Sequence, residues 1–112
     1  MSIYTDMIAV MKERGTCTGD LVDANGCVCV IGAYAYAKGM DPTIKGFDLN
    51  WPYTMAAKEL VSLKKVILAM NPALEPYQTG STLFWKYNDR IARGRQGVLI
   101  FALEQADELE RA

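Results

Sequence analysis

The fold is decided by residues 27–39, which read CVCVIGAYAYAKG. This segment has three alternating alanines, no proline, and Lys38 and Gly39 at its end, a pattern that favours a helix over about residues 27–38. Val28 to Ile31 alone is also consistent with a strand. The helix is apolar on nearly every side, so we predict that it lies at the centre of the fold. Its small residues permit a neighbouring backbone to approach closely.

Apolar residues recur at helical spacing on both sides of this segment. The spacing predicts further helices over about residues 3–14, 52–70, 82–88 and 95–110, with a strand as the alternative for 82–88. The stretch between Asn71 and the last helix is too long for a loop without structure, which is why the short helix over about residues 82–88 is placed in it. The sequence therefore predicts a single all-α domain over residues 1–112, a bundle of four or five helices with the 27–38 helix central.

The composition argues against several functional classes. The 112 residues include 12 basic and 13 acidic side chains, with a formal charge of −1 and a pI near 5.3, so a nucleic-acid partner is not expected. The chain has no histidine, which removes the commonest general base. No apolar run approaches the ~20 residues that span a bilayer. We expect a cytoplasmic protein with no membrane partner and no cofactor.

Three cysteines, Cys17, Cys27 and Cys29, are the candidates for thiol chemistry. Their spacing does not match a Cys-x-x-Cys zinc knuckle, and no histidine can complete a site, so small buried hydrophobic residues are the expected interpretation. Cys27 lies near the start of the predicted helix and is the alternative as a nucleophile. A small enzyme that uses a cysteine or a carboxylate pair is therefore the alternative to a binding protein.

Charge is distributed unevenly over the last third of the chain. Residues 86–95 carry a net charge of +3, and residues 104–112 carry −3. Within one chain these clusters lie at opposite ends of a straight helix and cannot pair. The basic cluster of one copy can pair with the acidic cluster of a second copy, which suggests an antiparallel homodimer through residues 95–110. In it, Arg90, Arg93 and Arg95 of one chain approach Glu104, Glu108 and Glu110 of the other. Two separate solvated clusters are the alternative.

Two stretches of the chain resemble a family of small proteins of unknown function found in actinobacteria and their phages. They are Asp23-x-x-Gly26-x-x-Cys29-x-x-Gly32-Ala33, and Tyr87-Asn88-Asp89 with nearby Arg93 or Arg95 followed by Val98-Leu99. The resemblance implies an all-helical fold and a phage or accessory origin. It implies no reaction.

Residues 85–95 form the one segment where aromatic, polar and cationic side chains converge. We therefore predict a non-enzymatic binding protein, of phage or accessory type, that acts on a host protein or an anionic ligand. No catalytic residue or metal ligand is predicted. Capping of turns is the structural alternative for Asn88 and Asp89. The predicted binding residues are Trp85, Tyr87, Asn88, Asp89, Arg90, Arg93 and Arg95.

Overall fold

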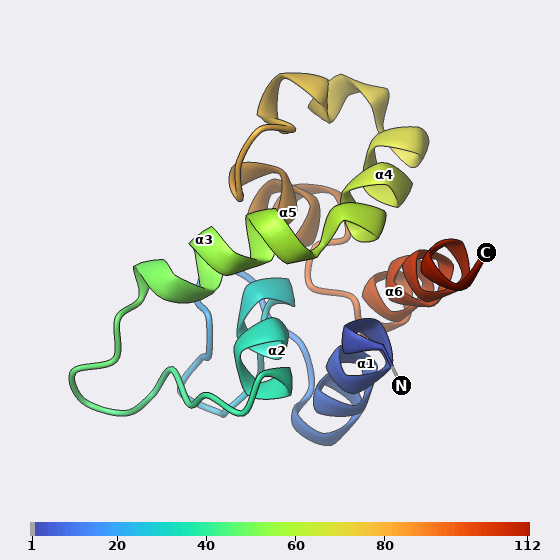
Figure 1. Ribbon diagram of the computed structural model, residues 1–112. Coiled ribbons are helices and arrows are strands. Elements are labelled where there is room, and N and C mark those ends of the chain that lie inside the picture. The colour runs from blue at the N-terminus through green and yellow to red at the C-terminus, as the bar shows by residue number, and fades with distance from the viewer. Residues whose placement is uncertain (1) are drawn as a thin grey trace.

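All of the predicted helices are present, and the chain contains more helices than expected. A computed structural model describes residues 2–112 and, over that range, shows six α-helices and no strand (Figure 1). The all-α prediction is confirmed, whereas the predicted number of four or five helices is too low. The α-helices are α1 (Ile3–Arg14), α2 (Val30–Ala37), α3 (Asn50–Glu59), α4 (Val61–Met70), α5 (Thr82–Lys86) and α6 (Gln96–Arg111). A 3-10 segment, η1 (Pro72–Tyr77), follows α4, and a π-helical turn, η2 (Tyr87–Ile91), follows α5.

Helix α2 begins three residues later than predicted because Cys29 is its N-cap. The Cys29 Sγ accepts a hydrogen bond from the main-chain N–H of Gly32, at 3.4 Å. The preceding Val28 instead forms isolated β-bridges with Thr16 and Val22. Of the strand considered for Val28 to Ile31, only this one residue has β-type pairing. Six of the eight residues of α2 are buried. Its central position, between α1 and α3, is visible in Figure 1.

Gly32 allows the backbone of another segment to approach α2 very closely. A Cβ atom at this position would lie 2.0 Å from the carbonyl oxygen of Leu21. That oxygen accepts a hydrogen bond from the main-chain N–H of Cys29, at 3.2 Å. Gly32 therefore has the packing role predicted for the small residues of this helix, and the neighbouring backbone is the loop over residues 15–29.

The single helix predicted over residues 52–70 is wrong in one respect, because it is two helices. The chain leaves helical geometry at Leu60, which has φ −88° and ψ 49° and is fully buried. No side chain caps the start of α4. Instead, the main-chain N–H of Leu63 donates to the hydroxyl of Tyr4 in α1, at 3.2 Å. A contact between distant segments thus supplies a partner for an N–H group in the first turn of α4.

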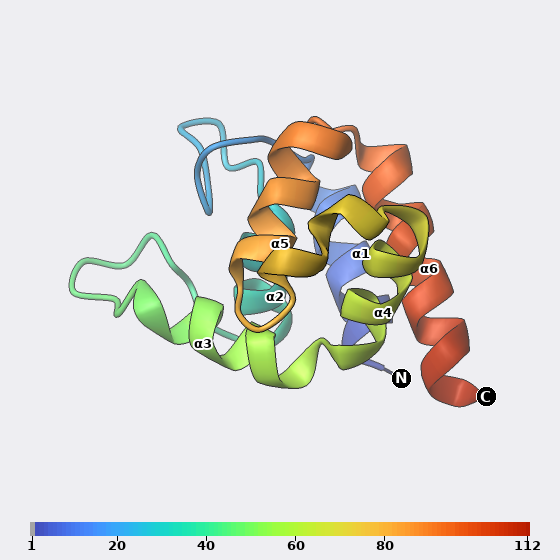
Figure 2. The ribbon, with the colours of Figure 1, turned by 90° about the horizontal axis from the view of Figure 1, so that it is seen from above.

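The core forms where α1 packs against both α2 and α6, α4 packs against α6, and α3 packs against α2 (Figures 1 and 2). Both views place the start of α1 close to the end of α6, and the Ser2 hydroxyl donates to the carboxylate of Asp107. The short helix expected in the stretch after Asn71 is present as α5, whereas η1 was not predicted. Within residues 2–112, none of the helices has the length and apolar character needed to cross a membrane.

Candidate binding surface

Asn88, one of the predicted binding residues, lies in the interior and holds three segments together. Its side chain is fully buried. The Oδ1 atom accepts a hydrogen bond from the main-chain N–H of Val30 at 3.0 Å, and Nδ2 donates to the carbonyl oxygen of Cys17 at 2.9 Å. These contacts tie η2 to the start of α2 and to the loop over residues 15–29. Asn88 therefore stabilises the fold from the interior.

The neighbours of Asn88 contribute to the same junction. The Asp89 carboxylate accepts hydrogen bonds from the main-chain N–H of Gly19, at 3.2 Å to Oδ2, and from Nδ2 of Asn88, at 2.8 Å to Oδ1. Tyr87 is buried, and that burial raises the pKa of its hydroxyl. Three of the seven predicted binding residues thus anchor this segment. Asn88 and Asp89 thus have structural contacts, but these reach far along the chain and differ from the local capping of turns given as the alternative.

The turn between η2 and α6 is held in an unusual backbone conformation. Arg93 and Gly94 both have positive φ angles, 53° and 67°. A Cβ atom on Gly94 would lie 3.0 Å from the Thr18 side chain and 3.2 Å from the carbonyl carbon of Cys17, so the position requires glycine. Arg95 is exposed, but its Nε donates to the carbonyl oxygen of Ala92 at 2.9 Å. Of the two arginines in this turn, Arg93 is the one that extends into solvent without a hydrogen bond among residues 2–112.

The remaining predicted residues belong to a surface where cations stack on aromatic rings. Lys86 Nζ lies 4.6 Å from the centroid of the Tyr77 ring and 4.9 Å from that of Trp85. The guanidinium carbon of Arg90 lies 5.6 Å from the Trp85 centroid. We call these four residues, Tyr77, Trp85, Lys86 and Arg90, the basic–aromatic surface. Neither Tyr77, from η1, nor Lys86, from α5, is among the predicted binding residues, because nothing in the sequence indicates that η1 folds back on α5.

Among residues 2–112, no carboxylate forms a salt bridge with the cations of the basic–aromatic surface. In the part of the chain that the structure describes, residues 2–112, the salt bridges are Lys38–Glu59 and Arg111–Asp107. Asp89, the one acidic residue nearby in sequence, is engaged by Gly19 and Asn88. Each cation–π contact contributes about 0.5–1 kcal/mol at an exposed site and restrains the side chain without neutralising its charge. The surface therefore presents positioned and uncompensated positive charge.

Two of the three cysteines, Cys17 and Cys29, are poorly suited to act as nucleophiles. Burial, reinforced by the nearby carboxylate of Asp23, raises the pKa of Cys17 to about 12, and burial raises the pKa of Cys29 to about 11. Both thiols are therefore protonated at neutral pH. Cys29 is also occupied as the N-cap of α2. Among residues 2–112, no group of three His, Cys, Asp or Glu side chains is arranged to hold a metal ion.

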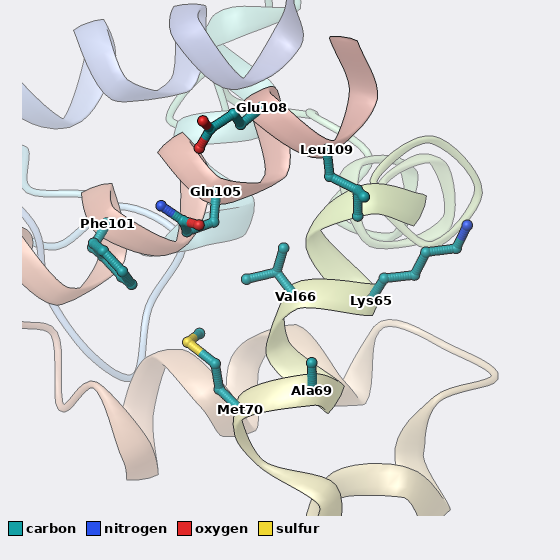
Figure 3. Close-up of a pocket in the computed structure, with 8 residues that line it drawn as sticks. All are labelled: Lys65, Val66, Ala69, Met70, Phe101, Gln105, Glu108 and Leu109. Carbon is teal, nitrogen blue, oxygen red and sulfur yellow. The ribbon is translucent and has the colours of Figure 1, made fainter. Parts of the chain in front are cut away.

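A second surface feature, which the sequence did not reveal, is an apolar groove of about 770 Å³ between α4 and α6 (Figure 3). Three large apolar side chains in it are strongly exposed: Phe101 (52%), Leu109 (45%) and Met70 (43%). The sequence feature that could have indicated an exposed apolar surface is the excess of apolar residues on α6, since one face of a helix cannot bury all of them. The lining residues are Lys65, Val66, Ala69, Met70, Phe101, Gln105, Glu108 and Leu109.

Comparison with curated proteins found no match, and comparison with solved structures found none either. A family match covers nearly the whole chain, including α1, α2 and the Asn88 junction. The expected resemblance to a family of unknown function is confirmed at this level. The chain matches DUF6197 over residues 2–108 and so belongs to that family, whose function is unknown.

Proposed function

We propose that this is a protein-binding domain that recognises an acidic segment of a partner protein through the basic–aromatic surface. The observation that carries the proposal is the stacking of Lys86 and Arg90 on the rings of Tyr77 and Trp85, with no carboxylate among residues 2–112 within salt-bridge distance of either cation. Such an arrangement offers charge for an anion and flat apolar area for the carbon atoms beside it.

The rings contribute by preparing the cations for binding. A free lysine or arginine side chain loses about 0.5–1.5 kcal/mol of conformational entropy when a partner immobilises it. Here Lys86 is half-buried between two rings before any partner arrives. Part of this entropic cost is therefore met on folding, and a carboxylate that approaches Lys86 meets a donor already in position.

An acidic protein segment fits this surface better than a nucleic acid does. The chain as a whole carries a charge of −1, so a long polyanion would be repelled by the rest of the surface. A short acidic segment meets only the local cluster, to which Arg93 adds a further cation from the adjacent turn. Given the resemblance to small actinobacterial and phage proteins, the partner we propose is a protein of a bacterial host.

Affinity capture from a bacterial lysate tests this proposal. The chain is compared with the double variant Lys86→Gln/Arg90→Gln, and with Arg14→Gln as a matched control. Arg14 also stacks on a ring, at 3.7 Å from the Tyr36 centroid, so its replacement removes an equivalent cation–π contact outside the surface. We expect the double variant to lose an acidic partner that the native chain and the control both retain. Recovery of the same proteins by all three would contradict the proposal.

A further inference from the structure

The groove between α4 and α6 is predominantly apolar, and it is separate from the basic–aromatic surface, with which it shares no residue. Figure 3 shows Val66 and Met70 extending from α4 and Phe101 and Leu109 from α6, on opposite sides of the same hollow. Exposed apolar side chains gathered in one groove indicate a contact surface, whereas scattered ones do not. The groove therefore needs an occupant.

The two walls of the groove carry opposite charge. Helix α4 contains Lys64 and Lys65 and no acidic residue, and Lys65 lines the groove. On α6, Glu108 lines the groove, and Glu104 lies on the exposed side of the same helix. Although Lys65 and Glu108 border the same hollow, they form no salt bridge within the described chain. Both walls thus retain charge that an occupant could neutralise.

We infer that the occupant is a second copy of this chain, in a two-fold symmetric homodimer. A surface with one basic and one acidic wall is complementary to itself, because a two-fold axis brings each α4 against the partner's α6. Lys65 then faces the partner's Glu108, and each exposed Phe101 enters the partner's groove. The contact retains α6 from the homodimer predicted by charge distribution, but it replaces the arginines of residues 90–95 with the lysines of α4.

The arginines of residues 90–95 are less suitable for the dimer because none of them lines the groove. Arg95 is also held against its own turn, where it donates to the carbonyl oxygens of Ala92 and Ile91, at 2.9 and 3.3 Å. An α6 contact that used them would also leave the α4 side of the groove, including Met70, uncovered. Pairing α4 with α6 covers both walls at once.

Sedimentation equilibrium of the purified chain over a range of concentrations tests the dimer. We expect a dimer whose dissociation constant rises about tenfold or more in Phe101→Gln, since a large aromatic anchor at the centre of an interface is lost. Ile44→Gln is the control, because Ile44 is 61% exposed and lies outside the groove. A monomer at all concentrations, or equal effects of the two substitutions, would overturn the inference.

A charge exchange tests the geometry of the contact. Lys65→Glu and Glu108→Lys should each weaken the dimer, because each places like charges on facing walls. The double variant Lys65→Glu/Glu108→Lys should restore it, which a loss of folding could not explain. Failure of the double variant to recover, or a dimer that responds to Arg95→Glu but not to Lys65→Glu, would overturn the pairing of α4 with α6.

Discussion

The buried Oδ1 atom of Asn88 accepts a hydrogen bond from the main-chain N–H of Val30, 58 residues earlier in the chain, at 3.0 Å. Val30 is the first residue of α2, so its N–H has no partner inside the helix. The amide nitrogen of the same side chain reaches the carbonyl oxygen of Cys17. One side chain thereby joins η2, α2 and the 15–29 loop, and it fixes the base of the segment that carries Trp85 and Arg90.

Replacement of Asn88 should therefore destabilise the whole domain. In Asn88→Ala, the N–H of Val30 and the carbonyl of Cys17 lose their side-chain partner, at about 1–3 kcal/mol for each buried group that is left unsatisfied. The free energy of unfolding, measured by urea denaturation, should fall accordingly. Asn25→Ala is the matched control, because Asn25 is exposed, and we expect a change within about 0.5 kcal/mol. Equal stability of the two variants would contradict the role given to Asn88.

Two glycines in helices should respond in opposite directions to the same substitution. Gly32→Ala places a Cβ atom 2.0 Å from the Leu21 carbonyl oxygen, so we expect a loss of stability of about 3 kcal/mol or more. Gly97→Ala, in α6, meets no atom within 4 Å and should gain about 0.5–1 kcal/mol from helix propensity. Thermal and urea denaturation measure both. A Gly32→Ala protein as stable as the native chain would show that the loop does not pack on α2 as described.

The thiols of Cys17 and Cys29 should react slowly with an alkylating reagent at neutral pH. Because the pKa of Cys17 is about 12 and that of Cys29 about 11, the reactive thiolate of each is scarce at pH 7. Iodoacetamide modification of Cys17 and Cys29, located by fragmentation of the 15–38 peptide in a mass spectrometer, should accelerate only at strongly alkaline pH. Rapid modification of either thiol at pH 7 would instead support the alternative of a cysteine enzyme.

The same pKa shifts predict how stability depends on pH. Below pH 9 the Cys17 thiol is protonated in both the folded and the unfolded chain, so its contribution is fully present. Above pH 9 the unfolded chain ionises first, and stability falls as the pH rises towards the folded value of about 12. The stability of Cys17→Ala should decline less steeply over this range. An identical decline in stability above pH 9 in the native chain and in Cys17→Ala would contradict the raised pKa of Cys17.

The elements with strong local signals were predictable from the sequence. Helix α1 was predicted at residues 3–14 and lies at Ile3–Arg14, because its apolar spacing and its N-cap, Ser2, are local properties. The central position of α2 followed from its apolar character on all sides. The break at Leu60 was not predictable, because no proline or glycine marks it and the Tyr4 hydroxyl that meets the first turn of α4 comes from α1.

The candidate site was predicted only in part, for the same physical reason. A run of aromatic, polar and cationic residues indicates a surface, but it does not say which side chains turn inward. The burial of Asn88 was not predictable, because its hydrogen-bond partners, at Val30 and Cys17, lie far away in sequence. Lys86 was counted only as charge, since its position between two rings depends on how η1 folds back. The groove depends on the relative placement of α4 and α6, which periodicity does not encode.

The most direct test of the central claim is a fluorescence titration of the basic–aromatic surface. The chain has two tryptophans, so in a Trp51→Phe background Trp85 becomes the sole tryptophan reporter. The probes are a short peptide rich in Asp and Glu and its counterpart with Asn and Gln. We predict a saturable change in Trp85 emission with the acidic peptide alone, weakened by salt and by Lys86→Gln/Arg90→Gln but not by Arg14→Gln. An unchanged emission, or equal binding of the two peptides, would contradict the account.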